Sequence, residues 1–190
     1  MNAYKQHFLR LAIYNRWAYR QLYDKLDECI TDENYRADSG LFFRSIHGTL
    51  VHLLLSSKLW FARLTASLSN PLNDEKYPHE INSYWSRSSE DWETAISDRK
   101  ELKTEIMNEC DRWISYVKEL DEDSLMNEGT ATYIDMQKTQ QTRSRAEALD
   151  HIFNHNTHHR GQITAAMTKY GGRAAAPVID LSLMPKDEYD

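Results

Sequence analysis

Apolar residues recur every three or four positions along four long segments of this chain, and this period is that of an amphipathic helix. The first segment shows the repeat at Phe8, Leu11, Asn15, Ala18, Leu22 and Leu26. The chain has four prolines, and all of them fall outside the four segments, where the repeat has stopped. The pattern therefore predicts an all-α fold.

We expect the helices at residues 3–29, 45–68, 88–120 and 144–170. The second is apolar around much of its circumference, which predicts a central position, and Ser45 is a suitable N-cap for it. The third carries a strongly charged stretch at residues 97–105, which we expect to be exposed. Asn15 interrupts the apolar stripe of the first helix. It either hydrogen-bonds to a neighbouring helix or lines a pocket.

Residues 121–142 differ in character, because threonines and Gly129 favour extended structure and turns. A short hairpin or an irregular crossover fits this stretch, and a long connection suits a bundle whose last helix returns across the fold. That last helix has a capping box at its start, formed by Ser144 and Glu147. Gly171 and Gly172 can end it, and Pro177 prevents its resumption. A chain of 190 residues fits a single domain, residues 1–190.

Composition narrows the class of protein. Cys29 and Cys110 lie far apart, so they form no disulfide framework and no CxxC motif. The formal net charge of −6 disfavours direct contact with nucleic acid. No stretch approaches the ~18 apolar residues of a membrane span, and the N-terminus is too charged for a signal peptide. We therefore expect a cytoplasmic protein with neither a membrane nor a nucleic-acid partner.

Four of the eight histidines lie between residues 151 and 159. On a helix, His155 and His159 stand one turn apart on one face, with His151 one turn earlier and His158 about 60° to the side. The same face carries Ala148, Ile152, Gln162, Ile163, Ala166 and Tyr170, so we expect it to face the core. Several imidazoles in an apolar core need partners, and a metal ion satisfies them together. Hydrogen bonding within the core is the alternative.

A mononuclear site needs a third ligand from another helix. The second helix offers His47, which flanks its main apolar stripe, and His52, which points about 150° away from it. Periodicity alone favours His47, although a central helix can use both faces. His7 and His79 lie near an end and in a loop, and we expect both at the surface.

Other metal and nucleophile motifs are absent. The chain has no HExxH of metalloproteases, no Glu-x-x-His of di-iron bundles and no GxSxG. Three imidazoles without a thiolate favour Zn²⁺, Ni²⁺ or a similar ion over Mg²⁺ or Ca²⁺.

The chain resembles the DinB/YfiT-like family of metal-binding four-helix bundles over nearly its whole length. The resemblance is carried by four motifs, at residues 14–18 (YNRWA), 42–52 (FFRSIHGTLVH), 154–162 (NHNTHHRGQ) and 177–181 (PVIDL). Trp60 and the Ala62–Arg63 pair complete the second motif. Residues 56–58 depart from it, because many relatives carry an acidic residue before the Trp.

The resemblance implies that His52, His155 and His159 are the metal ligands. The third ligand is then His52 and not His47, which periodicity favoured. His47 and His151 then become residues around the pocket. It also implies a four-helix bundle with a long crossover between helices three and four, one bound Zn²⁺ or Ni²⁺, and a homodimer. Some relatives transfer low-molecular-weight thiols such as bacillithiol or mycothiol, and others are described as metal-dependent hydrolases.

Two functions stay open at this point. In the first, the protein is a metal-dependent thiol S-transferase or hydrolase that acts on a small molecule through a metal-activated water or thiol. His151, Gln162 or Asn15 would then orient the reacting group, although the catalytic residues are not identified. In the second, it is a non-catalytic, stress-related protein whose metal is structural.

Overall fold

The computed structural model describes residues 3–65, 87–121, 125, 130–135 and 139–189. Its long helices are α1 (Ala3–Cys29), α3 (Ile46–Thr65), α6 (Arg99–Glu119) and α7 (Arg145–Gly171). Short helices α2 (Asp32–Arg36) and α5 (Ser89–Trp92) precede α3 and α6. A hairpin, β1 (Thr130–Ile134) and β2 (Gln140–Ser144), precedes α7. Three single-turn helices, η2 (Arg173–Ala175), η3 (Leu181–Leu183) and η4 (Lys186–Tyr189), end the described chain.

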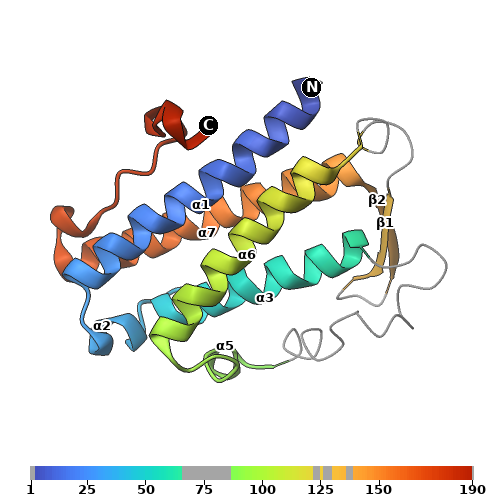
Figure 1. Ribbon diagram of the computed structural model, residues 1–190. Coiled ribbons are helices and arrows are strands. Elements are labelled where there is room, and N and C mark those ends of the chain that lie inside the picture. The colour runs from blue at the N-terminus through green and yellow to red at the C-terminus, as the bar shows by residue number, and fades with distance from the viewer. Residues whose placement is uncertain (1–2, 66–86, 122–124, 126–129, 136–138, 190) are drawn as a thin grey trace.

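The four long helices lie alongside one another in two pairs (Figure 1). α1 and α7 run in the same direction, and α3 and α6 run in the opposite one. α1 packs on α6 and α7, while α3 packs on α7 and α6. The all-α fold predicted from the apolar period is thereby confirmed.

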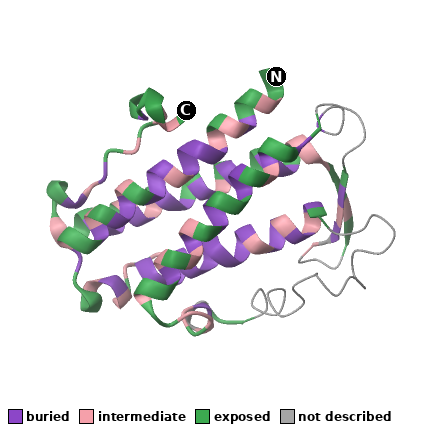
Figure 2. Cartoon of the chain, viewed as in Figure 1, coloured by how far each residue is buried: buried purple, intermediate pink, exposed green. Residues whose placement is uncertain are grey.

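The second predicted helix is the most deeply buried long helix of the described chain (Figure 2). Its side chains are buried around most of its circumference, since the consecutive residues Leu50, Val51, His52 and Leu53, which point in four directions, are at most 2 % exposed. Ser45 caps its start as predicted, because the Ser45 hydroxyl accepts a hydrogen bond from the Gly48 amide at 2.9 Å. The last predicted residues of this helix, 66–68, lie outside the described residues.

The third predicted helix is divided. Residues 93–98 separate α5 from α6, and Asp98 begins α6 by accepting a hydrogen bond from the Glu101 amide at 2.7 Å. The continuous helix predicted over residues 88–120 was therefore wrong at its start. The break lets Trp92 turn inward, where it is 2 % exposed and packs on Phe43. Within the charged stretch Leu102 is fully buried, so the expected exposure holds only for its neighbours.

The connection between α6 and α7 contains the hairpin that was one of the two predicted alternatives. β1 and β2 pair antiparallel, with Thr130 opposite Ser144. The predicted capping box at the start of α7 is present. The Ser144 hydroxyl accepts from the Glu147 amide, and the Glu147 carboxylate accepts from the Ser144 amide. Gly172, at φ +66°, ends α7 in a conformation that favours glycine.

The C-terminal segment runs back along α1 (Figure 1). The Tyr14 hydroxyl donates to the Ile179 carbonyl at 2.7 Å, and Arg20 pairs with Glu188. These contacts cover one side of α1, while its other side packs on α6 and α7. Among the described residues, no helix combines the length and apolarity that a membrane span requires.

Candidate metal centre

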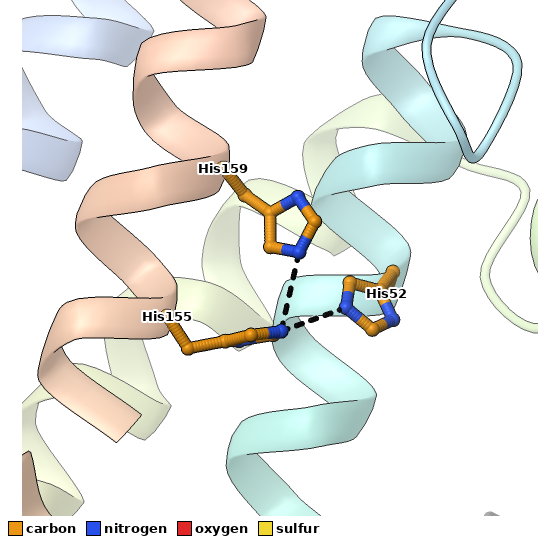
Figure 3. A group of neighbouring side chains, drawn as sticks. All are labelled: His52, His155 and His159. Carbon is orange, nitrogen blue, oxygen red and sulfur yellow. Dashed lines mark hydrogen bonds between the residues drawn. The ribbon is translucent and has the colours of Figure 1, made fainter. Parts of the chain in front are cut away.

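Three histidines from two helices meet in the interior, between α3 and α7 (Figure 3). The Nε2 atom of His155 lies 3.1 Å from that of His52 and 3.2 Å from that of His159. One ligand atom from each of the three residues lies within 4.8 Å of the other two. His52 and His159 are buried, and His155 is half-buried. The structure thus brings together the three residues that the family resemblance named as ligands.

Helix geometry accounts for this convergence. His155 and His159 stand one turn apart on α7, so their rings project side by side toward α3 (Figure 3). His52 projects from α3 toward both. The ring of Phe43 stacks on His52, with ring centroids 3.8 Å apart and 16° between planes. Trp92 meets the same imidazole edge-on at 5.0 Å. Two aromatic rings therefore restrict the orientation of His52.

The loop before α3 places Phe43. Arg44 takes a positive φ of 65°, which turns the chain sharply, and its guanidinium pairs with Glu93 at 2.7 Å. The Phe43 carbonyl packs against Gly48, where a Cβ atom would approach the oxygen to 2.3 Å. Only glycine permits that approach. The loop is thus held against the first turn of α3, with the Phe43 ring over His52.

Burial keeps these imidazoles neutral. It lowers the pKa of His52 to about 2, with further lowering from His155 and His159. Burial also lowers the pKa of His155 to about 3, and neighbouring histidines add to the effect. For His159 burial lowers the pKa, while the hydrogen bond that its Nδ1–H donates to Gln162 opposes the change. Near neutral pH the cluster therefore presents uncharged rings, the form in which histidine binds metals.

Gln162 fixes the tautomer of His159. Its Oε1 atom lies 2.7 Å from His159 Nδ1 and can only accept, so the Nδ1–H of the imidazole donates to it. The Nε2 atom of His159 then carries a lone pair directed at the cluster. Histidines that bind metals are commonly oriented by such a partner on the second ring nitrogen.

The arrangement fits a divalent ion. Metal–nitrogen bonds of about 2.0–2.1 Å at tetrahedral angles place ligand nitrogens roughly 3.3 Å apart, close to the two separations seen here. Without a cation, a neutral His155 carries at most one Nε2 proton for its two neighbours, so hydrogen bonding alone cannot satisfy both contacts with well-aligned bonds. Within the described part of the chain, no fourth His, Cys, Asp or Glu joins the group. The side chains present can supply three ligands and leave a coordination position for another molecule.

The other described histidines place no ring nitrogen at the point where the three meet, although the ring of His158 packs against that of His159. His47 is fully buried but packs on Tyr35 of α2, and its Nε2 lies 3.4 Å from the Glu93 carbonyl. The preference for His47 from periodicity was therefore wrong, because α3 is buried on several faces and His52, not His47, lies on the face that meets His155 and His159. His7 and His158 are exposed. His79 lies outside the described residues.

His151 departs from the predicted stripe. It is exposed, although the periodicity placed it with His155 on the core face. Its ring stacks on His155, with centroids 5.6 Å apart, and rests against Trp60 at 4.8 Å. His151 thus borders the cluster at the surface, whereas Tyr170 and Gln162 on the same stripe are half-buried.

Asn15 is a buried residue that bonds to neighbouring helices, as one of the two readings held. It accepts from the Arg160 guanidinium of α7 and donates to Cys110 Sγ of α6 at 3.7 Å. Arg160 is only 1 % exposed and lies over the rings of Tyr14 and Tyr19. This network joins three helices directly behind His159. Asn15 also lines a small cavity among all four long helices, so the other predicted alternative holds as well, but none of the three clustered histidines lines that cavity.

Sequence reasoning missed Phe43 and Trp92 as residues of the site. Both come from segments outside the long helices, where the apolar period gives no information. Phe43 lies within the second motif of the resemblance, and its place directly before the cap of a central helix was the available signal. Trp92 lies in the helix predicted over residues 88–120, but nothing in the sequence linked it to His52.

Comparison with known proteins agrees with this architecture. The sequence model of the DinB family matches residues 1–185. Protein DinB of Bacillus subtilis (strain 168) is 27 % identical over 169 residues, which cover 88 % of each chain. No solved structure gives a significant match. A match over almost the whole chain, together with the helical fold and the three converging histidines, shows that the chain belongs to the DinB family.

Proposed function

We propose that this protein binds one divalent metal ion, Zn²⁺ or Ni²⁺, through His52, His155 and His159 and is an enzyme acting on a small molecule. The observation that carries the proposal is the convergence of three neutral, mostly buried imidazoles with no fourth protein ligand among the described residues. Three imidazole donors suit borderline ions of this kind.

A bound ion of this kind lowers the pKa of a coordinated water or thiol, which supplies a nucleophile near neutral pH. The protein itself orients the metal ligands and shields them from water. Gln162 holds His159 in one tautomer, and Phe43 and Trp92 exclude water from the side of His52. The half-buried His155 and the exposed His151 leave the opposite side nearer to solvent. The most specific reaction that we propose is transfer of a low-molecular-weight thiol. Hydrolysis of a small molecule is the second reaction that such a site could catalyse.

A structural metal is the competing function. The burial of His52 and His159 between two helices favours it, because an ion there would join α3 to α7. The two functions differ at the remaining coordination position. A catalytic ion exchanges a water or thiol there, whereas a structural ion has a closed shell.

The first test is the metal content of the untagged protein. We expect one equivalent of ion in the wild type and in His158→Ala, because His158 is exposed and lies outside the cluster. His155→Ala removes a ligand from the cluster and should leave the protein with no retained ion after dialysis. Elemental analysis of the three proteins gives the answer. Absence of ion from the wild type after incubation with excess Zn²⁺ or Ni²⁺ would contradict the proposal.

A second assay separates the two functions. Thiol-transfer or hydrolytic activity should disappear on chelation and return with the ion. Full activity in His155→Ala would exclude a catalytic metal.

We also propose that the protein is a homodimer, located in the cytoplasm and without nucleic-acid partners. Sedimentation equilibrium showing a mass of one chain would contradict the dimer.

A further inference from the structure

Arg63 lies in a corner of two aromatic rings beside the histidine cluster. Its guanidinium carbon lies 4.2 Å from the ring centre of Tyr133 on β1 and 4.8 Å from that of Trp60 on α3. The two rings pack edge to face, with centroids 5.0 Å apart. We call these three residues the Arg63 corner. Cation–π contact of this kind holds a guanidinium in one place while leaving its N–H groups free to donate.

Arg63 has no acidic partner among the described residues. By contrast, Arg16, Arg44 and Arg99 each lie within 4 Å of a carboxylate oxygen. The Nε atom of Arg63 is buried and makes no hydrogen bond within the described chain. The same holds for the Nε atoms of Arg16 and Arg99, so Arg63 differs in that no described carboxylate meets its terminal N–H groups, for which an oxyanion is the strongest partner. The arginine is therefore preorganised for a negatively charged group.

The corner is connected to the histidine cluster through His151. From His155, the His151 ring follows at 5.6 Å, the Trp60 ring at 4.8 Å and the Arg63 guanidinium at a further 4.8 Å. Partial loss of hydration lowers the pKa of His151, and the positive charges of Arg63 and Arg143 lower it further. Arg143 also acts on Glu147. Within the described part of the chain, Arg63 is thus a positive charge beside the cluster that no carboxylate pairs with.

We propose that Arg63 binds an oxyanion, a carboxylate or phosphate, on the small molecule whose other end reaches the histidine cluster. The proposal rests on the proposed function and narrows its substrate to an anionic, extended molecule. A planar guanidinium recognises both groups through paired N–H donors, so carboxylate and phosphate share one chemistry here.

The first arm of the test does not need the metal. Inorganic phosphate and malonate are titrated by calorimetry into metal-free protein, into Arg63→Gln and into Arg10→Gln, where Arg10 is an exposed arginine on α1. We expect wild type and Arg10→Gln to bind one of the two anions with equal affinity and Arg63→Gln to bind it roughly tenfold more weakly. Whichever anion binds identifies the group. Arg63→Lys keeps the charge and checks that a loss in Arg63→Gln is not a folding defect, with circular dichroism as a second check.

The second arm tests the link to the cluster. In Co²⁺-loaded protein, thiol binding is followed by the sulfur-to-cobalt absorption for a mercapto-carboxylic acid and the mercapto-alcohol of equal chain length. We expect the acid to bind roughly tenfold more tightly, and Arg63→Gln to remove that preference without weakening the alcohol.

The outcomes are distinct. Anion affinity that is absent, or unchanged by Arg63→Gln, overturns the oxyanion site whether or not the protein binds metal. Anion binding at Arg63 without a preference for the acid overturns the assignment of the site to the substrate. Failure to take up Co²⁺, with Arg63-dependent anion binding intact, counts against the proposed function and leaves the oxyanion site standing.

Discussion

His47 and His52 lie five positions apart on α3, and their surroundings show what periodicity can resolve. The pair His155 and His159 was predictable from spacing, because residues four apart on a helix always share a face. The choice of His52 came from the family resemblance. Periodicity identifies the buried face of a helix with one apolar stripe, but α3 is buried on several faces, so its stripe does not say which face meets α7.

A buried carboxylate on α6 gives a prediction at this scale. Glu109 is 5 % exposed, and its Oε1 atom has no hydrogen bond within the described chain. Burial raises its pKa above the ordinary value of 4.5, while Arg112 opposes the rise. The folded state therefore favours the protonated acid, so this contribution to stability is full below pH 4.5 and is lost as the pH rises through the raised pKa.

Glu109→Gln should for this reason stabilise the protein near neutral pH by about 1–2 kcal/mol, because glutamine carries no charge to bury. The gain should vanish below about pH 4.5, where wild-type Glu109 is protonated in both states. Urea unfolding at both pH values measures this difference. Glu119→Gln, at an exposed position on the same helix, should change little. A neutral-pH loss of stability in Glu109→Gln would show that the ion pair with Arg112, at 3.3 Å, outweighs the cost of burying the charge.

The elements divide into those that local signals determine and those that tertiary contacts determine. α1, α3 and α7 follow from the apolar period and their caps, and α7 begins where Ser144 and Glu147 indicated. The break between α5 and α6 did not follow, because residues 93–98 contain no proline or glycine to announce it. It arises from packing, since Trp92 contacts Phe43 and His52. The short helix α2 was missed for the same reason. It is stabilised by a tertiary contact, in which the Tyr35 ring packs on His47.

The capping box formed by Ser144 and Glu147 at the start of α7 should contribute measurably to the stability of the protein. Ser144→Ala removes the hydroxyl that satisfies the Glu147 amide, and we expect a loss of about 1 kcal/mol, or roughly 2–4 °C in melting temperature. Metal content should not change, because His155 lies three turns further along α7. Ser97→Ala, at an exposed position without a capping role, is the matched control. An equal effect of both substitutions would show that the capping box contributes nothing.

At the scale of the molecule, the histidine cluster connects two helices that run in opposite directions and belong to different pairs. α3 meets α7 through these rings and through the Trp60–His151 contact near the hairpin. An ion held there binds the folded state alone, so its affinity adds directly to the stability of the whole fold.

Chelation should therefore lower the melting temperature of the wild type. With free ion at a hundred times its dissociation constant, the loss is about 2.7 kcal/mol, or roughly 5–10 °C for a chain of this size. His155→Ala should melt at one temperature with or without chelator, and His158→Ala should behave as the wild type. Differential scanning calorimetry provides the comparison. A wild-type transition that chelator leaves in place would mean that no ion stabilises the fold.

His52 and His155 are separated by 103 positions in the chain. A ribosome therefore releases the first ligand long before the other two exist, and no partial product that ends ahead of α7 can assemble the cluster. Acquisition of the proposed ion would then be a late event, which follows translation of α7 and its return across the fold. The loaded centre would then distinguish finished chains from truncated ones, and a cell's supply of metal would act on completed molecules.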